Sequence, residues 1–223
     1  DILPSVPGMC MMRMDDYVEK LLTGLPADSM EGVAETPAAD HLFKIRPPEE
    51  ARILPESQAI AFHHTTAQLL FLSRVRRDIQ TAVAFLATRV KAPDEDDWGK
   101  LKRVLQYLKG TLHMPLILSA DSMTMPRWWV DAAYAVHHDC KGHTGAGMSL
   151  GRGMAMSYSW KQKINTKSST EAEIVGVDDS LAYILWARYF LQEQGYDMEP
   201  SLLYQDNMSA ILLETNGKAS SSK

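Results

Sequence analysis

The sequence predicts a protein of the α/β or α+β class, with a helical first half and a second half that combines a sheet with helices. Apolar residues recur at helical spacing through residues 56–91 and 96–109, which favours helices in the first half. After residue 114 they fall in short runs that are typical of β-strands, separated by glycine-containing turns. This change of period places a domain boundary between residues 1–114 and 115–223.

The first half is expected to be mostly helical. A short amphipathic helix fits Asp15–Leu22, and prolines at four positions between 26 and 48 then interrupt regular structure. The long apolar pattern over residues 56–91 indicates helix with a break near Ser73–Asp78. Acidic residues at 94–97 start a further helix that extends to Lys109 and carries a stripe of apolar side chains.

The second half is expected to alternate between strands and helices. The predicted strands cover residues 115–120, 127–136, 142–151, 154–163 and 201–205. The Gly-Arg-Gly sequence at 151–153 would form the turn between the third and fourth of these strands. A long helix is predicted over residues 169–194, and Asn207 is predicted to cap a last helix.

Composition indicates an ordinary globular protein. The 223 residues are 45% hydrophobic and 23% charged. Cys10 and Cys140 have no partner at zinc-ligand spacing and cannot form a disulfide framework. No apolar run has the length of a membrane span and no secretory signal is visible, so we expect an intracellular protein.

Basic residues gather locally although the net charge is −5. The interval between Asp139 and Glu171 contains no acidic residue, and it contains five basic ones: Lys141, Arg152, Lys161, Lys163 and Lys167. Such a stripe can follow a phosphate backbone. For the stripe taken alone, a solvated protein face is the preferred interpretation.

Three carboxylates lie within or next to the predicted strands and helices of the second half. Asp131 lies inside an apolar strand, Glu173 in the first turns of the long helix, and Asp206 between the last strand and the last helix. A carboxylate inside an apolar strand is costly unless a cation compensates its charge. Brought together, the three would repel one another unless they held a metal, and ligands that are all oxygen favour Mg²⁺ or Mn²⁺.

Each carboxylate also has an ordinary structural interpretation as a salt-bridge partner or a helix cap. These are an ion pair of Asp131 with Arg127 or Lys163, a capping box of Glu173 with Thr170, and an N-cap of the last helix by Asp206. A capping box of Ser168 with Glu171 would instead leave Glu173 free. The case for a metal site rests on the three carboxylates occurring together in this order.

Several segments of the second half resemble, in order, the RNase H domain of Ty1/copia-type retrotransposon polyproteins. They are WWVDAAYAVHHD, HTGAGMSLG, SWKQKINTKSSTEAEIVGV and LLYQDNMSAILL. Segments of the first half resemble the end of the same family's reverse transcriptase: DYVEKLL, TPAADHL, HHTTAQLLFL, DIQTAVAFLATR and LKRVLQYLKGT. The resemblance covers nearly the whole chain.

The resemblance implies a helical segment of thumb and connection type over residues 1–114. It implies an RNase H-like mixed sheet with helices, C-terminally truncated, over residues 115–223. The family's catalytic carboxylates are an Asp on the first strand, a Glu on the first helix and an Asp before the next helix. They correspond to Asp131, Glu173 and Asp206, with Glu173 chosen over Glu171 because it leads into the apolar helix face.

The implied activity is hydrolysis of the RNA strand of an RNA–DNA hybrid by two-metal catalysis, with Mg²⁺ or Mn²⁺ held by these carboxylates. The implied contacts to the hybrid are Lys161, Lys163, Lys167 and Asn207. The remaining implied partners are the palm and fingers of the reverse transcriptase, elsewhere in the polyprotein, and no membrane. The expected location is a cytoplasmic particle or the nucleus.

The sequence also departs from the family pattern. The Tyr-x-Asp-Asp motif of the polymerase is absent, Ala133 stands where the family has a second Asp, and a fourth carboxylate is expected beyond the tail that ends at Lys223. The main alternative is therefore a decayed or truncated copy that acts at most as a nucleic-acid-binding or structural module. A DDE-type transferase on the same fold is disfavoured, because its carboxylates come in the order Asp, Asp, Glu.

Overall fold

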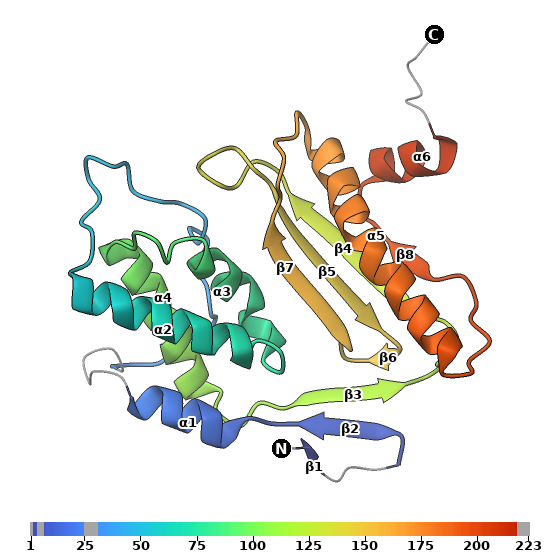
Figure 1. Ribbon diagram of the computed structural model, residues 1–223, viewed down its shortest axis with the longest axis horizontal. Helices are drawn as coiled ribbons and strands as arrows, with labels where there is room; N and C mark the ends of the chain where they lie inside the picture. Colours follow the sequence, from blue (N-terminus) through green and yellow to red (C-terminus); the bar gives the residue numbers. More distant parts are fainter. Residues whose placement is uncertain (1, 4–6, 25–30, 218–223) are drawn as a thin grey trace. The chain divides into compact units, whose positions relative to one another are not determined.

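The computed structural model describes residues 2–3, 7–24 and 31–217 (Figure 1). The main boundary between two compact units lies between Leu116 and Ile117, close to the change of period in the sequence, and residues 7–9 near the N-terminus group with the second unit. None of the helices in the described ranges combines the length and the apolar character that a membrane span requires. Both cysteines are free.

The first unit is mainly helical, as the sequence predicted. Its helices are α1 (Asp15–Thr23), α2 (Glu56–Leu72), the short 3-10 helix η2 (Arg77–Ile79), α3 (Gln80–Ala87) and α4 (Glu95–Gly110). The expected break in the long helical pattern is the segment between α2 and α3. The structure adds a pair of short antiparallel strands, β1 (Ile2–Leu3) and β2 (Met9–Met12), in a segment expected to be irregular.

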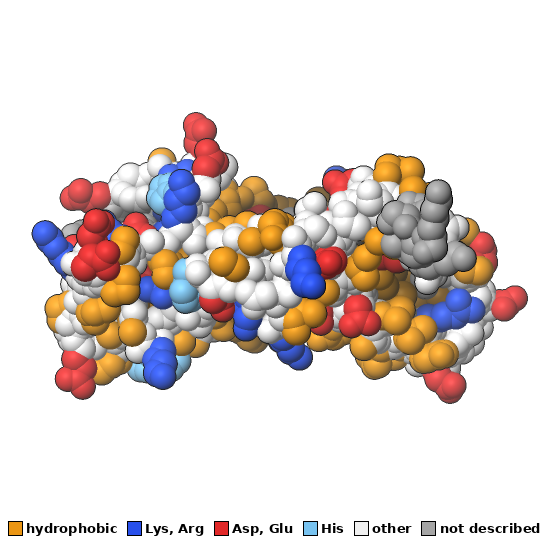
Figure 2. All heavy atoms as spheres, turned by 90° about the horizontal axis from the view of Figure 1, so that it is seen from above, with side chains coloured by type: hydrophobic (Ala, Val, Ile, Leu, Met, Phe, Trp, Pro, Cys, Tyr) orange, Lys and Arg blue, Asp and Glu red, His pale blue; other side chains and the backbone are white. Residues whose placement is uncertain are grey.

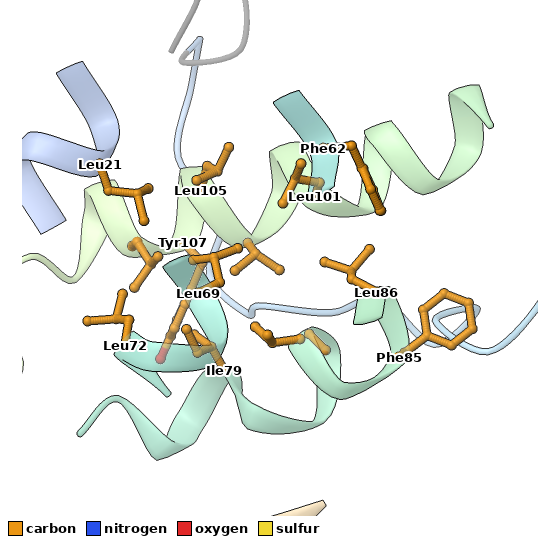
Figure 3. Close-up of a cluster of buried hydrophobic side chains, with 14 of the residues drawn as sticks. Leu21, Phe62, Leu69, Leu72, Ile79, Phe85, Leu86, Leu101, Leu105 and Tyr107 are labelled. Atoms are coloured by element: carbon orange, nitrogen blue, oxygen red, sulfur yellow. The ribbon is translucent and has the colours of Figure 1, made fainter. Parts of the chain in front are cut away.

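Apolar side chains from these helices form one core (Figure 3). The labelled residues in that view are Leu21, Phe62, Leu69, Leu72, Ile79, Phe85, Leu86, Leu101, Leu105 and Tyr107. Among the buried charged residues of this unit is Arg76, which is only 3% exposed. Its guanidinium donates to the Asp78 carboxylate and to the Thr111 carbonyl, so the charge is fully engaged and joins η2 to the end of α4.

The second unit is built on a mixed four-stranded sheet in the order β7-β5-β4-β8. Its elements are β3 (Leu116–Ala120), β4 (Arg127–Ala133), β5 (His143–Ser149), β6 (Gly151–Arg152), β7 (Met156–Lys161), α5 (Ser169–Glu193), β8 (Leu202–Tyr204) and α6 (Met208–Asn216). Strand β5 is antiparallel to both neighbours, whereas β4 and β8 are parallel. Helix α5 connects one edge of the sheet, β7, to the other, β8 (Figure 1).

The hairpin between β5 and β7 differs from the expected simple turn. Gly151 and Arg152 pair with β3 as the short strand β6. Gly153 has φ +74°, and a Cβ at this position would lie 2.1 Å from the Ile117 carbonyl oxygen. Only glycine allows the backbone to approach β3 this closely, so the Gly-Arg-Gly sequence serves a second strand pairing as well as a turn.

Helix α5 packs on one face of the sheet. Along β4, Trp128, Val130 and Ala132 are buried, whereas the alternate residues are exposed. Gly176 of α5 lies against this buried face, where a Cβ would be 3.3 Å from methyl groups of Val130 and Thr144. The absence of a side chain at Gly176 thus sets the distance between helix and sheet.

We predict that Gly176→Val destabilises the second unit by about 1–3 kcal/mol, because the added methyl groups overpack this contact. The matched control is Ala182→Val, which makes the helix less favourable at an exposed position of the same helix and costs at most about 0.7 kcal/mol. Urea unfolding followed by circular dichroism measures both changes. Equal losses in the two variants would show that the close approach at Gly176 carries no strain.

Candidate metal centre

Three elements of the second unit bring carboxylates together. Asp131 lies in the middle of β4, Glu173 in the first turns of α5, and Asp206 between β8 and α6. One carboxylate oxygen of each residue lies within 4.8 Å of one oxygen of each of the other two. Glu173 is buried, and the two aspartates are exposed. The group therefore has one fixed, desolvated member and an open side towards solvent.

The capping pattern of α5 explains why Glu173, and not Glu171, lies in this group. The Ser168 side chain is the N-cap and accepts a hydrogen bond from the Glu171 amide at 3.2 Å. The Glu171 carboxylate turns back to accept from the Lys167 amide at 2.7 Å. Glu173 is about 200° further around the helix, which directs its side chain towards the sheet.

The burial of Asp131 was predicted wrongly. The apolar residues around it suggested a buried carboxylate, but β4 is exposed on the face that carries Trp129 and Asp131. The apolar neighbour Trp129 is itself 39% exposed and stacks on Tyr204. Arg127 pairs with Asp121 at 3.5 Å, so it is engaged away from Asp131. The carboxylate that loses its contact with water is that of Glu173.

The electrostatics of the group are unfavourable without a cation. Burial raises the pKa of Glu173, and the charges of Asp131 and Asp206 raise it further. A hydrogen bond from Gln205 and one from the Ala132 backbone oppose this rise in the pKa. A set of oxygen ligands that is partly desolvated and mutually repulsive suits a hard divalent cation such as Mg²⁺ or Mn²⁺.

Gln205 is a contact that the sequence did not reveal. Its side-chain amide nitrogen donates to Glu173 Oε2 at 3.0 Å, and its amide oxygen accepts from the Asn207 backbone amide at 3.0 Å. The one sequence signal is its place directly before Asp206. The residue type did not indicate a role in the site, because glutamine often stands next to an acidic residue in a sequence.

The predicted nucleic-acid contacts have different surroundings. Lys161 is partly buried and forms an ion pair with Asp139 at 2.8 Å, whereas Lys163 and Lys167 are exposed in the segment before α5. The Asn207 side-chain oxygen caps α6 by accepting the Ser209 and Ala210 amides. In the view of Figure 2, basic side chains lie among acidic ones and form no separate basic patch.

A pair of buried histidines lies at the β4–β5 connection of the same unit. His137 Nε2 is 3.1 Å from His143 Nδ1, and His143 Nε2 is 2.7 Å from Ser159 Oγ. Burial is the main cause that lowers the pKa of both rings from 6.5 to about 4. Both rings are therefore neutral at pH 7, which lets them bond to each other without repulsion. The sequence analysis did not single out this pair.

The second unit should lose stability as the pH falls from about 6.5 towards 4, because the unfolded chain binds protons there and the buried rings do not. Replacing His143 with Gln should reduce the loss between pH 7 and pH 5 by roughly 1–2 kcal/mol. Urea unfolding at the two pH values measures the loss. Exposed His64 of the first unit, replaced by Gln, is the control. A pH dependence unchanged in His143→Gln would contradict the neutral pair.

A mixed sheet with one long helix crossing from β7 to β8, and carboxylates on β4, on that helix and after β8, defines an RNase H-like α/β unit. Comparison with known proteins extends this to the whole chain. The chain is a relative of the Pol polyproteins of Ty1/copia-type retrotransposons, at 25–33% identity.

Three relatives illustrate the similarity. The chain is 26% identical over 209 residues, or 92% of its length, to the retrovirus-related Pol polyprotein from transposon TNT 1-94 of Nicotiana tabacum. It is 33% identical over 150 residues, or 66% of its length, to that from transposon RE2 of Arabidopsis thaliana. It is 25% identical over 189 residues to a putative transposon Ty5-1 protein of Saccharomyces cerevisiae, covering 82% of the chain and 59% of that protein.

The alignments cover only part of the two plant polyproteins, namely 16% of the tobacco protein and 10% of the Arabidopsis one. The chain thus corresponds to a segment of a Pol polyprotein. No family model and no solved structure matches it.

Proposed function

We propose that the second unit is a metal-dependent ribonuclease of the RNase H type, which hydrolyses the RNA strand of an RNA–DNA hybrid. The observation that carries this proposal is the approach of Asp131, Glu173 and Asp206 to within 4.8 Å from three separate elements. Such an arrangement of like charges is retained at a cost, which a catalytic cation would offset. The relation to Pol polyproteins supports the choice of substrate.

The three carboxylates would hold Mg²⁺ or Mn²⁺ as shared oxygen ligands. When bound, such ions lower the pKa of a coordinated water and stabilise the leaving oxygen of a phosphodiester. Glu173 is held in the interior by α5, so it supplies a ligand whose position does not depend on the substrate. Asp131 and Asp206 are exposed and leave the outer side of the group open to a phosphate backbone.

Lys163 and Lys167 are the basic residues best placed to hold that backbone, since both are exposed in the segment that leads into α5. Lys161 is partly committed to Asp139 and would contribute less. Asn207 already uses its side-chain oxygen to cap α6, so its amide nitrogen is the part left for a nucleic-acid contact. The first unit would act as the thumb and connection segment that joins this nuclease to the polymerase part of the polyprotein.

Mn²⁺ or Mg²⁺ should stabilise the second unit, by roughly 2.7 kcal/mol when the cation is at a hundred times its Kd. Asp131→Asn and Glu173→Gln should each remove most of this stabilisation. Glu171→Gln is the matched control: it should weaken the start of α5 by roughly 0.3–1 kcal/mol, because it removes a negative charge from the first turn, and leave cation binding intact. Thermal unfolding with and without the cation measures the stabilisation. Cleavage of a labelled RNA–DNA hybrid by the same variants is measured in parallel.

The combined result separates the possibilities. Cation binding with hybrid cleavage supports the nuclease, and cation binding without cleavage supports the non-catalytic copy. Equal melting shifts in the wild-type chain and Asp131→Asn would rule out a metal site at these carboxylates.

Lys163→Ala and Lys167→Ala should each weaken hybrid binding uniformly across sequences. Each should also reduce the slope of log K against log salt by roughly 0.9, the value for one released counterion. Binding is measured by fluorescence anisotropy without divalent cation, so that no cleavage occurs. Lys91→Ala, at an exposed site of the first unit, controls for net charge. An unchanged salt slope in both variants would place the hybrid elsewhere.

A further inference from the structure

Gln205 occupies the point at which β8 leaves the sheet. Strands β4 and β8 pair in register from Arg127 and Leu202 up to Trp129 and Tyr204. Beyond that point the chain turns towards α6. The side-chain nitrogen of Gln205 then donates to the Val130 carbonyl at 3.4 Å, which continues the link between the two strands in place of backbone pairing. The amide of Gln205 thus fills the gap that opens between the two strands, directly beside the three carboxylates.

The hydrogen bonds of this side chain fix its orientation. The Asn207 backbone amide is a donor, so the oxygen of the Gln205 amide must face it, as the 3.0 Å distance shows. The amide nitrogen then faces the Glu173 carboxylate, 3.0 Å from Oε2, which can only accept. Reversing the amide would set oxygen against oxygen at Glu173, so the start of α6 determines what Gln205 presents to the carboxylate.

A neutral donor has a consequence that a basic side chain would not have. The amide restrains the Glu173 carboxylate while leaving its full negative charge available to a cation. A carboxylate has acceptor capacity for about four hydrogen bonds or ligands. The bonds from Gln205 and from the Ala132 backbone therefore leave acceptor positions of this carboxylate for metal coordination.

We infer that Gln205 is a positioning residue, which holds the buried Glu173 carboxylate in its binding orientation through its side-chain amide and thereby raises the affinity of the site for a divalent cation. The inference rests on the proposed metal-dependent function. Outer hydrogen-bond partners of metal ligands typically alter metal affinity by roughly 10- to 100-fold.

Three variants test this role. Gln205→Met keeps the length of the side chain and removes the donor, so Mn²⁺ affinity should fall by roughly 10- to 100-fold. Gln205→Lys keeps a donor but adds a positive charge, and should weaken Mn²⁺ binding at least as much. Gln192→Met, at an exposed position of α5, is the matched control and should bind Mn²⁺ as the wild type does. Isothermal titration calorimetry on the full chain gives each Kd.

Two further measurements separate positioning from general stability. Asn207→Ala removes the cap of α6 but leaves the Gln205 donor, so it should lower the melting temperature with less than a threefold change in Kd. In the metal-free protein, the side-chain amide signal of Gln205 in a ¹⁵N–¹H spectrum, identified by its absence in Gln205→Met, should shift in Glu173→Gln. This signal reports the hydrogen bond without any metal or activity.

The outcomes are distinguishable. If the wild-type chain binds no Mn²⁺, both the proposed function and this inference fall. If the wild type binds Mn²⁺ and Gln205→Met binds it equally well, only the role of Gln205 is overturned. An amide signal that does not respond to Glu173→Gln, or an equal loss of affinity in Asn207→Ala, would also reduce Gln205 to a structural contact.

Discussion

The packing of helix α5 on the sheet is the contact on which the rest of the second unit depends. The helix supplies Ile184 and Ala187 to the core with Trp128 and Met148, and its first turns carry Glu173. Hydrophobic burial along the helix therefore supplies the energy that holds a carboxylate where it is electrostatically unfavourable. The position of that carboxylate is set from the core outwards, and the exposed aspartates complete the group from the strands.

The start of α5 is fixed by several polar contacts as well. Gln162 is 1% exposed, and its side-chain nitrogen donates to the Ala172 carbonyl and the Thr144 hydroxyl. Glu171 and Ser168 satisfy backbone amides on the outer side of the same turn. The residue before Glu173 is thus tied to β5, and the residue two before it is tied to the preceding loop. Preorganisation of this kind lowers the cost of assembling a site when a ligand arrives.

Much of the fold could be predicted because local signals agreed with one another. The capping residues around Ser168 and Asn207 gave the starts of α5 and α6, and the change from helical to strand period gave the two halves. The face on which Asp131 lies could not be read in the same way. Trp129 and Val130, the two apolar residues before Asp131, both suit a strand interior. Only the position of α5 decides that Val130 faces the core and that Trp129 faces outwards together with Asp131.

Three other contacts could not be predicted from the sequence, for a different reason: those of Gln205, of His143 and of the short strand β6. Each joins residues that are distant in the chain: Gln205 meets Glu173, His143 meets Ser159, and Gly151 meets Ala120. None of these residues has a local sequence pattern that requires a distant partner. Their roles follow from tertiary placement, which a single sequence does not contain.

The bare α-carbon of Gly176 also has a genetic consequence. Every glycine codon begins with GG, so any single-base change at either of these two positions that leaves a sense codon gives that residue a side chain. A related sequence could therefore retain Asp131, Glu173 and Asp206 and still carry a disturbed arrangement after one such change, because an added side chain must displace the methyl groups of Val130 and Thr144 or move the helix. A comparison of related sequences by their acidic residues alone would not detect such a change.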